Sequence, residues 1–95
     1  METFEVAHLN IQAVNVVIIF LNRHFDSMLP DQQHGAHRRL QLAARAAGLA
    51  GNVVPVWLDP FGRMKFIAPQ NQHPFFTSVS YDHLRRSVNR TLSCN

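Results

Sequence analysis

The sequence predicts a small α/β protein, on the border of α+β, with a mixed sheet of three to four strands and two main helices packed on it. Two apolar runs, residues 16–21 and 53–58, have the length and β-branched content of buried strands. A helical pattern lies between them, and a second one follows near residue 80. We therefore expect one domain over residues 1–95, in the order strand, helix, strand, strand, helix, after an N-terminal element.

The run at residues 16–21 is the centre of the predicted sheet, because it has no polar face. Side chains alternate along a strand, so the run would present apolar groups to both sides of the sheet, and each side needs a cover. The two sets are Val16, Ile18 and Phe20 on one side and Val17, Ile19 and Leu21 on the other. The run is shorter than the roughly 20 residues of a membrane span. A buried helical turn remains the alternative for it.

The segment before this run allows two interpretations. Phe4 and Val6 alternate with Glu5 as in a short edge strand, whereas Ala7, Ile11 and Val14 fit one face of a short helix. Both interpretations stay open from the sequence alone.

The first main helix is expected from Asp31, as N-cap after Pro30, to about Ala47, with Gly48 or Gly51 ending it. Its predicted inner stripe is Ala36, Leu40, Ala43, Ala44 and Ala47, and its outer stripe is His34, Arg38, Gln41 and Arg45. One helix between two strands predicts a right-handed crossover and a parallel strand pair.

The second half of the chain predicts a hairpin and a final helix. Pro55 belongs at an edge, a bulge or a strand start, since it has no N–H for a central ladder. The sequence Asp59–Gly62 favours a type I turn, which leads into a return strand over residues 63–68. Ser80 is the expected N-cap of the last helix. Its predicted inner positions are Tyr81, Leu84, Val88 and Leu92.

The two helices could cover opposite faces of the sheet or share one face. In the second arrangement the other face is left for a partner, and a second copy of the chain is the natural occupant of such an apolar surface. Self-association is therefore one expectation.

The net charge of +3 is unevenly distributed. Residues 1–34 carry one basic and four acidic side chains, a net −3, and residues 35–95 carry eight basic and two acidic ones, a net +6. The basic residues on the hairpin and the last helix are a candidate surface for phosphates or other anions: Arg63, Lys65, Arg85, Arg86 and Arg90. No helix-turn-helix, RNP pair or GXXG loop supports sequence-specific reading of nucleic acid.

A ligand pocket or small active site would lie beyond the carboxyl ends of the parallel strands, at residues 22–27. His24 is the candidate general base there, with the carboxylates of Asp26 and Asp59 nearby. No glycine-rich phosphate loop supports this hypothesis, and Asp59 is already explained by its turn.

Three further features have both a binding and a structural interpretation. His34 and His37 have i, i+3 spacing that suits two metal ligands, but no cysteine pair or HExxH motif accompanies them, so no metal or cofactor is indicated. His73 beside Phe75 and Phe76 would form either a binding loop or a plug of the core. Phe61 would be an apolar hairpin tip for a partner or a nucleobase.

The single cysteine, Cys94, cannot form a disulfide within the chain, and the acidic start Met1–Glu5 is unlike a signal peptide. The prediction is a small cytoplasmic binding or regulatory protein, more an interaction protein than an enzyme. It would have no membrane contact, and it would act on another protein or on its own copies. A nucleic-acid-binding accessory protein and a small enzyme or ligand-binding protein are the alternatives.

Overall fold

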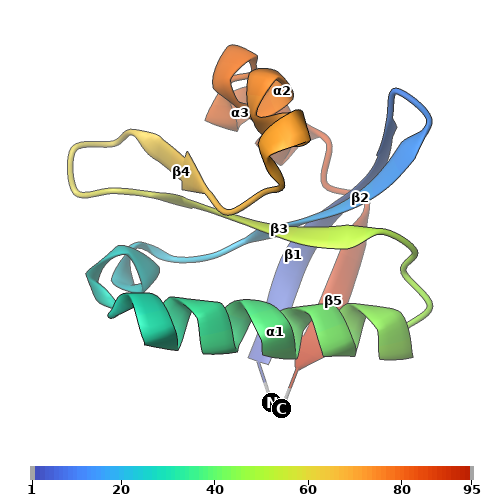
Figure 1. Ribbon diagram of the computed structural model, residues 1–95, viewed down its shortest axis with the longest axis horizontal. Helices are drawn as coiled ribbons and strands as arrows, with labels where there is room; N and C mark the ends of the chain where they lie inside the picture. Colours follow the sequence, from blue (N-terminus) through green and yellow to red (C-terminus); the bar gives the residue numbers. More distant parts are fainter. Residues whose placement is uncertain (1, 95) are drawn as a thin grey trace.

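The computed structural model describes residues 2–94, which form one five-stranded sheet in the order β4-β3-β2-β1-β5 (Figure 1). The strands are β1 (Glu2–Ile11), β2 (Val14–Phe20), β3 (Asn52–Leu58), β4 (Met64–Phe66) and β5 (Arg90–Cys94). The helices are α1 (Pro30–Ala46), α2 (His73–Ser78) and α3 (Tyr81–Arg86), with 3-10 turns η1 (Arg23–Ser27) and η2 (Gln70–Gln72). The predicted class, α/β with a mixed sheet, is confirmed, with five strands in place of three or four.

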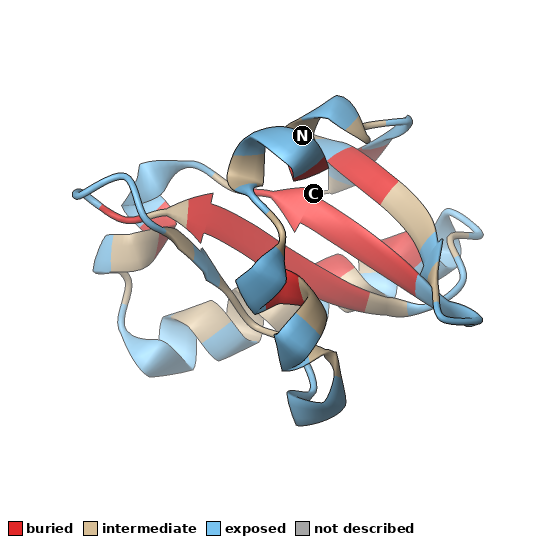
Figure 2. Ribbon diagram, turned by 90° about the horizontal axis from the view of Figure 1, so that it is seen from above, coloured by how far each residue is buried: buried red, intermediate tan, exposed pale blue. Residues whose placement is uncertain are grey.

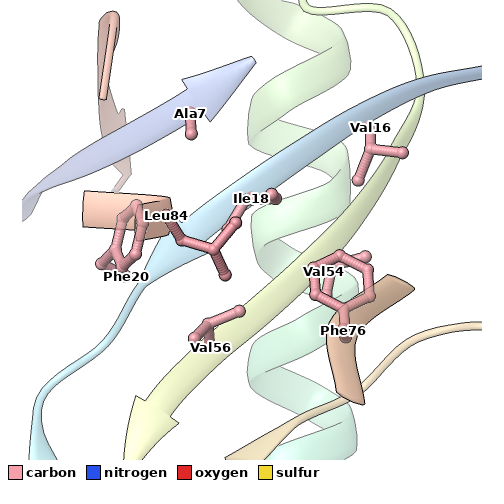
Figure 3. Packing of buried hydrophobic residues seen from close by; sticks show 8 residues of the cluster. All are labelled: Ala7, Val16, Ile18, Phe20, Val54, Val56, Phe76 and Leu84. Carbon is pink, nitrogen blue, oxygen red and sulfur yellow. The ribbon is translucent and has the colours of Figure 1, made fainter. Parts of the chain in front are cut away.

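The central strand is confirmed, and it is buried from both sides. β2 lies between β1 and β3, with Ile18 beside Ala7 on one neighbour and Val54 on the other. In Figure 3 the side chains of Val16, Ile18 and Phe20 lie on the near side of the sheet while α1 passes behind it. The pair β2/β3 is parallel, as the crossover through α1 requires.

The main helices cover opposite faces of the sheet (Figure 1). On one face Phe76 of α2 and Leu84 of α3 belong to the cluster around Ile18. On the other face Leu40 and Ala44 of α1 pack with Ile19. Figure 2 shows the buried positions concentrated in the sheet between these layers. A bare sheet face therefore gives no reason for self-association, and any such reason must come from elsewhere in the fold.

The N-terminal segment is a strand, so its interpretation as a helix is wrong. β1 pairs with β2 from Val6 beside Ile19 to Ile11 beside Val14. The two turn residues, Gln12 and Ala13, have φ of 51° and 66°. Positive φ at both central positions matches the right-handed twist of a two-residue hairpin. The ten residues of β1 gain main-chain pairing along their length, which a short helix would lack.

The helix α1 starts two residues earlier than predicted. Its N-cap is Leu29, and Asp31 as N-cap is wrong, because Pro30 takes the first helical position, where no N–H is needed. The side chain of Gln32 accepts the Leu29 N–H at 3.0 Å. Asp31 instead places its carboxylate in the first turn, where the helix dipole favours it. The predicted end is confirmed, with Gly48 at φ 78° after Ala47.

The last helix is shorter than predicted. The side chain of Ser80 accepts the His83 N–H at 3.1 Å, so the predicted N-cap is confirmed. The helix ends at Arg86, however, and residues 90–94 form β5, so the inward helical position of Leu92 is wrong. Pairing with β1 places Leu92 beside Phe4 and leaves it 2 % exposed. Strand pairing with β1, about ninety positions away in the chain, thus prevails over the local helical spacing of Leu84, Val88 and Leu92.

Pro55 lies in β3 at the point where the pairing with β4 ends. The N–H of Leu21 bonds to the carbonyl of Val56 at 2.9 Å, so the backbone of Val56 faces β2 and that of Pro55 faces the β4 side. The paired residues of β4 end opposite Val56, and the Pro55 carbonyl accepts the Ile67 N–H at 3.2 Å. Opposite residues that face each other in an antiparallel pair exchange two bonds, and Pro55 has no N–H to donate to the Ile67 carbonyl. The β3–β4 ladder therefore stops at Pro55, which lies on an inner strand and resembles the predicted edge position only because β4 is short.

No helix between residues 2 and 94 combines the length and the apolar character that crossing a bilayer demands.

Gly51 lies where the chain that enters β3 comes close to the backbone of β2. A Cβ there would lie 2.3 Å from the carbonyl oxygen of Asn15, and its φ is +118°. We expect Gly51→Ala to destabilise the protein by more than about 2 kcal/mol, since both the clash and the backbone conformation disfavour it. Urea unfolding followed by Trp57 fluorescence measures this.

The matched control is Gly48→Ala. Gly48 also has a positive φ, +78°, but a Cβ there meets nothing within 4 Å. Only the backbone term of about 1 kcal/mol applies to it. Equal losses for the two variants would contradict the close approach of Gly51 to β2.

Candidate functional site

The loop after β2 is held in place by side chains of the β3–β4 hairpin. The ring of Phe25 lies edge-on to Trp57 with 4.6 Å between centroids. One oxygen of Asp26 accepts the Trp57 Nε1–H at 3.1 Å and pairs with Lys65 Nζ at 3.3 Å. Asp26 is therefore an anchor between the loop and the hairpin.

Asp59 holds the tip of the same hairpin. It is 2 % exposed, and its Oδ1 accepts the backbone N–H of both Phe61 and Arg63 at 2.9 Å. Its Oδ2 accepts the Arg63 Nε–H at 3.1 Å. The Arg63 backbone N–H, with the Phe61 N–H and the Arg63 guanidinium, holds the pKa of Asp59 below its ordinary value, although burial opposes this shift. The type I turn predicted at Asp59 is confirmed by the Gly62 N–H, which bonds to the Asp59 carbonyl at 3.0 Å.

The three residues proposed for catalysis are thus used in different places. Asp26 binds Trp57 and Lys65, and Asp59 binds the turn that it begins. His24 is exposed, and its backbone N–H is bonded to the Asn22 side chain at 3.0 Å. The structure gives His24 no carboxylate partner among residues 2–94 that would orient it as a base.

His24 does line a cleft of about 220 Å³ between α1 and the carboxyl end of β2. The charged groups in its wall are Arg39 from α1 and Glu2 from β1, and Cys94 of β5 is also part of the wall. The apolar lining comes from Phe4, Leu21, Phe25, Met28, Ala36 and Leu40. The strand end predicted for a pocket therefore carries one, and Arg39 and Glu2 are the charged groups that the sequence did not place there.

The five basic residues proposed for anion binding do not converge. Arg63 and Lys65 lie at or beside β4, and Arg90 lies on β5 at the opposite edge of the sheet. Four strand spacings of about 4.8 Å put these edges roughly 19 Å apart. Arg63 pairs with Asp59 at 3.1 Å and Lys65 pairs with Asp26 at 3.3 Å.

Arg85 is also engaged within the fold. Its Nη2 is 2.7 Å from Glu5 Oε1, and its guanidinium lies 4.8 Å from the centre of the Phe20 ring. Arg85 of α3 thus contacts Glu5 of β1 and packs on the Phe20 ring at the border of the core. Arg86 next to it is exposed.

Within the described part of the chain, His34 and His37 are not grouped with a third metal-ligating side chain. Among residues 2–94 no three histidine, cysteine, aspartate or glutamate side chains are grouped to hold an ion. His37 Nε2 lies 2.7 Å from the Val53 carbonyl oxygen, so this ring nitrogen already has a partner. His34 lies beside it at a shallow surface that also includes Ile67.

The aromatic residues singled out after the hairpin divide between core and surface. Phe76 is buried and Phe75 packs against it with 5.1 Å between ring centroids, which confirms the structural interpretation of this pair. His73 lies at the surface beside this pair, and its Nε2 is 2.9 Å from the Ala68 carbonyl oxygen. Phe61 is 82 % exposed at the hairpin tip, with the Arg63 guanidinium 5.4 Å from its ring centre.

The edges of the sheet are closed in specific ways where strands end early. Beyond the end of β4, the Val53 N–H donates to Gln41 Oε1 at 2.8 Å, and the Val53 carbonyl lies 2.7 Å from His37 Nε2. Both side chains come from α1. The helix therefore supplies the partners that a longer β4 would have given to β3.

Asn89 closes the other side of the sheet in the same way. Its Oδ1 accepts the His8 N–H at 2.9 Å, and its Nδ2 donates to the His8 carbonyl at 3.0 Å. One amide side chain thus pairs both main-chain groups of His8, just before β5 begins. The amide caps β1 where β5 does not reach it.

β5 itself has an open outer edge. The Asn89 N–H bonds to the Val6 carbonyl, so the backbone of Val6 faces β5, and by alternation those of Phe4 and Glu2 do too. Their register partners are Arg90, Leu92 and Cys94. The intervening residues, Thr91 and Ser93, therefore turn their N–H and C=O groups outward. No strand of the described chain lies on that side.

Comparison with known proteins gives no match: no protein-family model, curated protein or solved structure is significantly similar to this chain. A function must therefore be argued from the chain's own residues. Within residues 2–94, the open edge of β5 and the cleft beside it are two neighbouring features from which a function can be argued.

The bonds to Asp59 make stability depend on pH. The native pKa is below the ordinary value of 3.8, so the carboxylate contributes stability at pH above that value, and the contribution is lost as pH falls through the native pKa. We expect Asp59→Asn to unfold at lower urea than the wild type at pH 7. The two midpoints should converge as the pH is lowered past the native pKa.

A difference in midpoint that stays constant down to the acid transition would contradict the role of the charge. Asp82→Asn is the control, because Asp82 is an exposed acid in the first turn of α3. It should alter the midpoint at pH 7 only slightly.

Proposed function

We propose that this is a small binding protein that acts as a homodimer, formed by antiparallel pairing of β5 with β5 of a second copy. The observation that carries the proposal is the outer edge of β5, where Thr91 and Ser93 present main-chain groups without a strand beside them. An unpaired edge is a template for strand addition. The backbone N–H groups of His8 and Val53, in contrast, are hydrogen-bonded to the side chains of Asn89 and Gln41.

The outward groups favour one register. In an antiparallel pair two outward-facing residues exchange both hydrogen bonds, so Thr91 of each copy should face Ser93 of the other. Leu92 then lies on the two-fold axis opposite its own copy. Four main-chain bonds form, all from residues that the structure describes. A register centred on Thr91 or on Ser93 would use fewer of these groups.

The charges near the edge suit the same register. Arg90 of one copy would lie opposite Cys94 of the other, and Cys94 lies beside Glu2 in the β1–β5 pair. All three side chains are on the α1 face, because Leu92 and Cys94 pack there. A guanidinium thus approaches a carboxylate across one strand, twice by symmetry. No charged residue of β5 faces a like charge.

The alternatives have less support. A nucleic-acid surface would need its arginines on one face, and Arg63 lies at the edge opposite Arg90. Catalysis at His24 would need an orienting partner. The single cysteine fits a reducing compartment, and we place the protein in the cytoplasm in this proposal.

Proline at position 93 tests the open edge directly. The Ser93 N–H faces away from β1, so Ser93→Pro removes a donor that the monomer does not use, and proline is tolerated at such edge positions. We expect the wild type to form dimers with rising concentration in sedimentation velocity and the proline variant to stay monomeric. The control Ser93→Ala keeps the N–H and should dimerise like the wild type. Equal association of the two variants would remove β5 from the interface.

Charge pairs at the exposed positions 91 and 93 test the register. Thr91→Lys with Ser93→Lys places lysines opposite each other twice, whereas Thr91→Lys with Ser93→Glu places opposite charges there. Cross-strand charge pairs differ by about 1 kcal/mol each, so the dissociation constants should differ by about tenfold or more. Identical dissociation constants for the two double variants would exclude a register centred on Leu92.

A further inference from the structure

We propose that the cleft beside Cys94 is a binding site for a small carboxylate with an apolar chain, and that Arg90 of a second copy completes it. This inference rests on the dimer proposed above. The cleft lies between α1 and the sheet, and its walls come from β1, the loop after β2, α1 and β5. One of these walls is therefore the edge strand to which the second copy would add its own β5.

The position of Arg90 of a second copy follows from the register. With Leu92 on the two-fold axis, it faces Cys94, and Cys94 is part of the cleft wall. Arg90 is exposed in the single chain, and its Nη1 donates to the Asn89 carbonyl at 2.9 Å. This leaves most of its five donors for another group.

The charges of the completed cleft select an anion. In one copy Arg39 and Glu2 both line the cleft, so one positive and one negative charge lie in its wall. Arg90 of the second copy, which approaches Glu2 in the proposed register, adds one positive charge and leaves the completed cleft with an excess of one positive charge. With two guanidinium groups and one carboxylate, the cleft would be neutralised by one further carboxylate. Arginine binds a carboxylate in a bidentate geometry.

The rest of the lining selects an apolar body for that anion. Phe4 of β1, Leu21 just after β2 and Leu40 of α1 give the cleft apolar walls, and its volume is about 220 Å³. This space is below the usual range of drug-sized pockets, roughly 300–1,000 Å³, so the ligand should be short. A straight-chain monocarboxylate such as hexanoate has the matching chemistry.

Binding of this kind should strengthen the dimer, because the complete site exists only when two copies are joined. Sedimentation velocity of the full chain with hexanoate should show the dimer dissociation constant falling by about tenfold at saturation. Hexanol, which has the same chain without the charge, and inorganic phosphate, which has the charge without the chain, should change it less than twofold.

Two variants and a control locate the effect. Arg90→Gln and Arg39→Gln should each abolish the response to hexanoate, while Arg86→Gln, which removes an exposed charge on α3, should keep it. Circular dichroism verifies that each variant is folded. Loss of the response in Arg86→Gln as well, or an equal response to phosphate, would overturn the site.

The outcomes separate this inference from the proposed dimer. A dimer that forms without any response to hexanoate overturns the ligand site and leaves the proposed function standing. A monomer at all concentrations, with and without hexanoate, overturns both. Hexanoate binding of equal affinity to the wild type and to the Ser93→Pro monomer overturns the contribution of the second copy.

Discussion

The constraint on which this fold depends is that main-chain amides in the sheet need partners, and the pairing of β1 with two strands meets it. β1 bonds to β2 on one side and to β5 on the other. The first and last described segments are thereby joined in one sheet. Without β5, the even-numbered residues of β1 would turn unpaired groups to solvent, and Leu92 would lose its place in the core. The α1 face, the cleft and the open edge all follow from this pairing.

The same constraint explains several side chains that have no catalytic role. Gln41 and His37 complete β3 where β4 ends, and Asn89 completes β1 where β5 ends. Asp59 closes the hairpin tip by accepting main-chain N–H groups. Polar residues that suggest chemistry when read in isolation here satisfy the backbone. This use of polar side chains is the reason that Thr91 and Ser93, whose main-chain groups face outward, stand out.

Charge has a similar double role in the candidate site. Asp26 and Asp59 are neutralised by Lys65 and Arg63 within the hairpin region. Glu2 and Arg39 form no such ion pair among residues 2–94, and both line the cleft at the carboxyl end of β2. His24 could be predicted for that cleft because strand ends of a parallel pair are common ligand positions. Arg39 and Glu2 could not, since their approach depends on how α1 crosses the sheet and on where β1 begins.

The sequence by itself determined the central strand, the crossover helix, the hairpin turn at Asp59 and the cap at Ser80, because these follow from side-chain periodicity and from local hydrogen bonds. Only the tertiary structure decided that residues 2–11 are a strand, that the last helix stops at Arg86 and that residues 90–94 pair with β1. These choices depend on hydrogen bonds between segments almost a chain length apart, and a local pattern such as that of Leu84, Val88 and Leu92 contains no information about a distant partner.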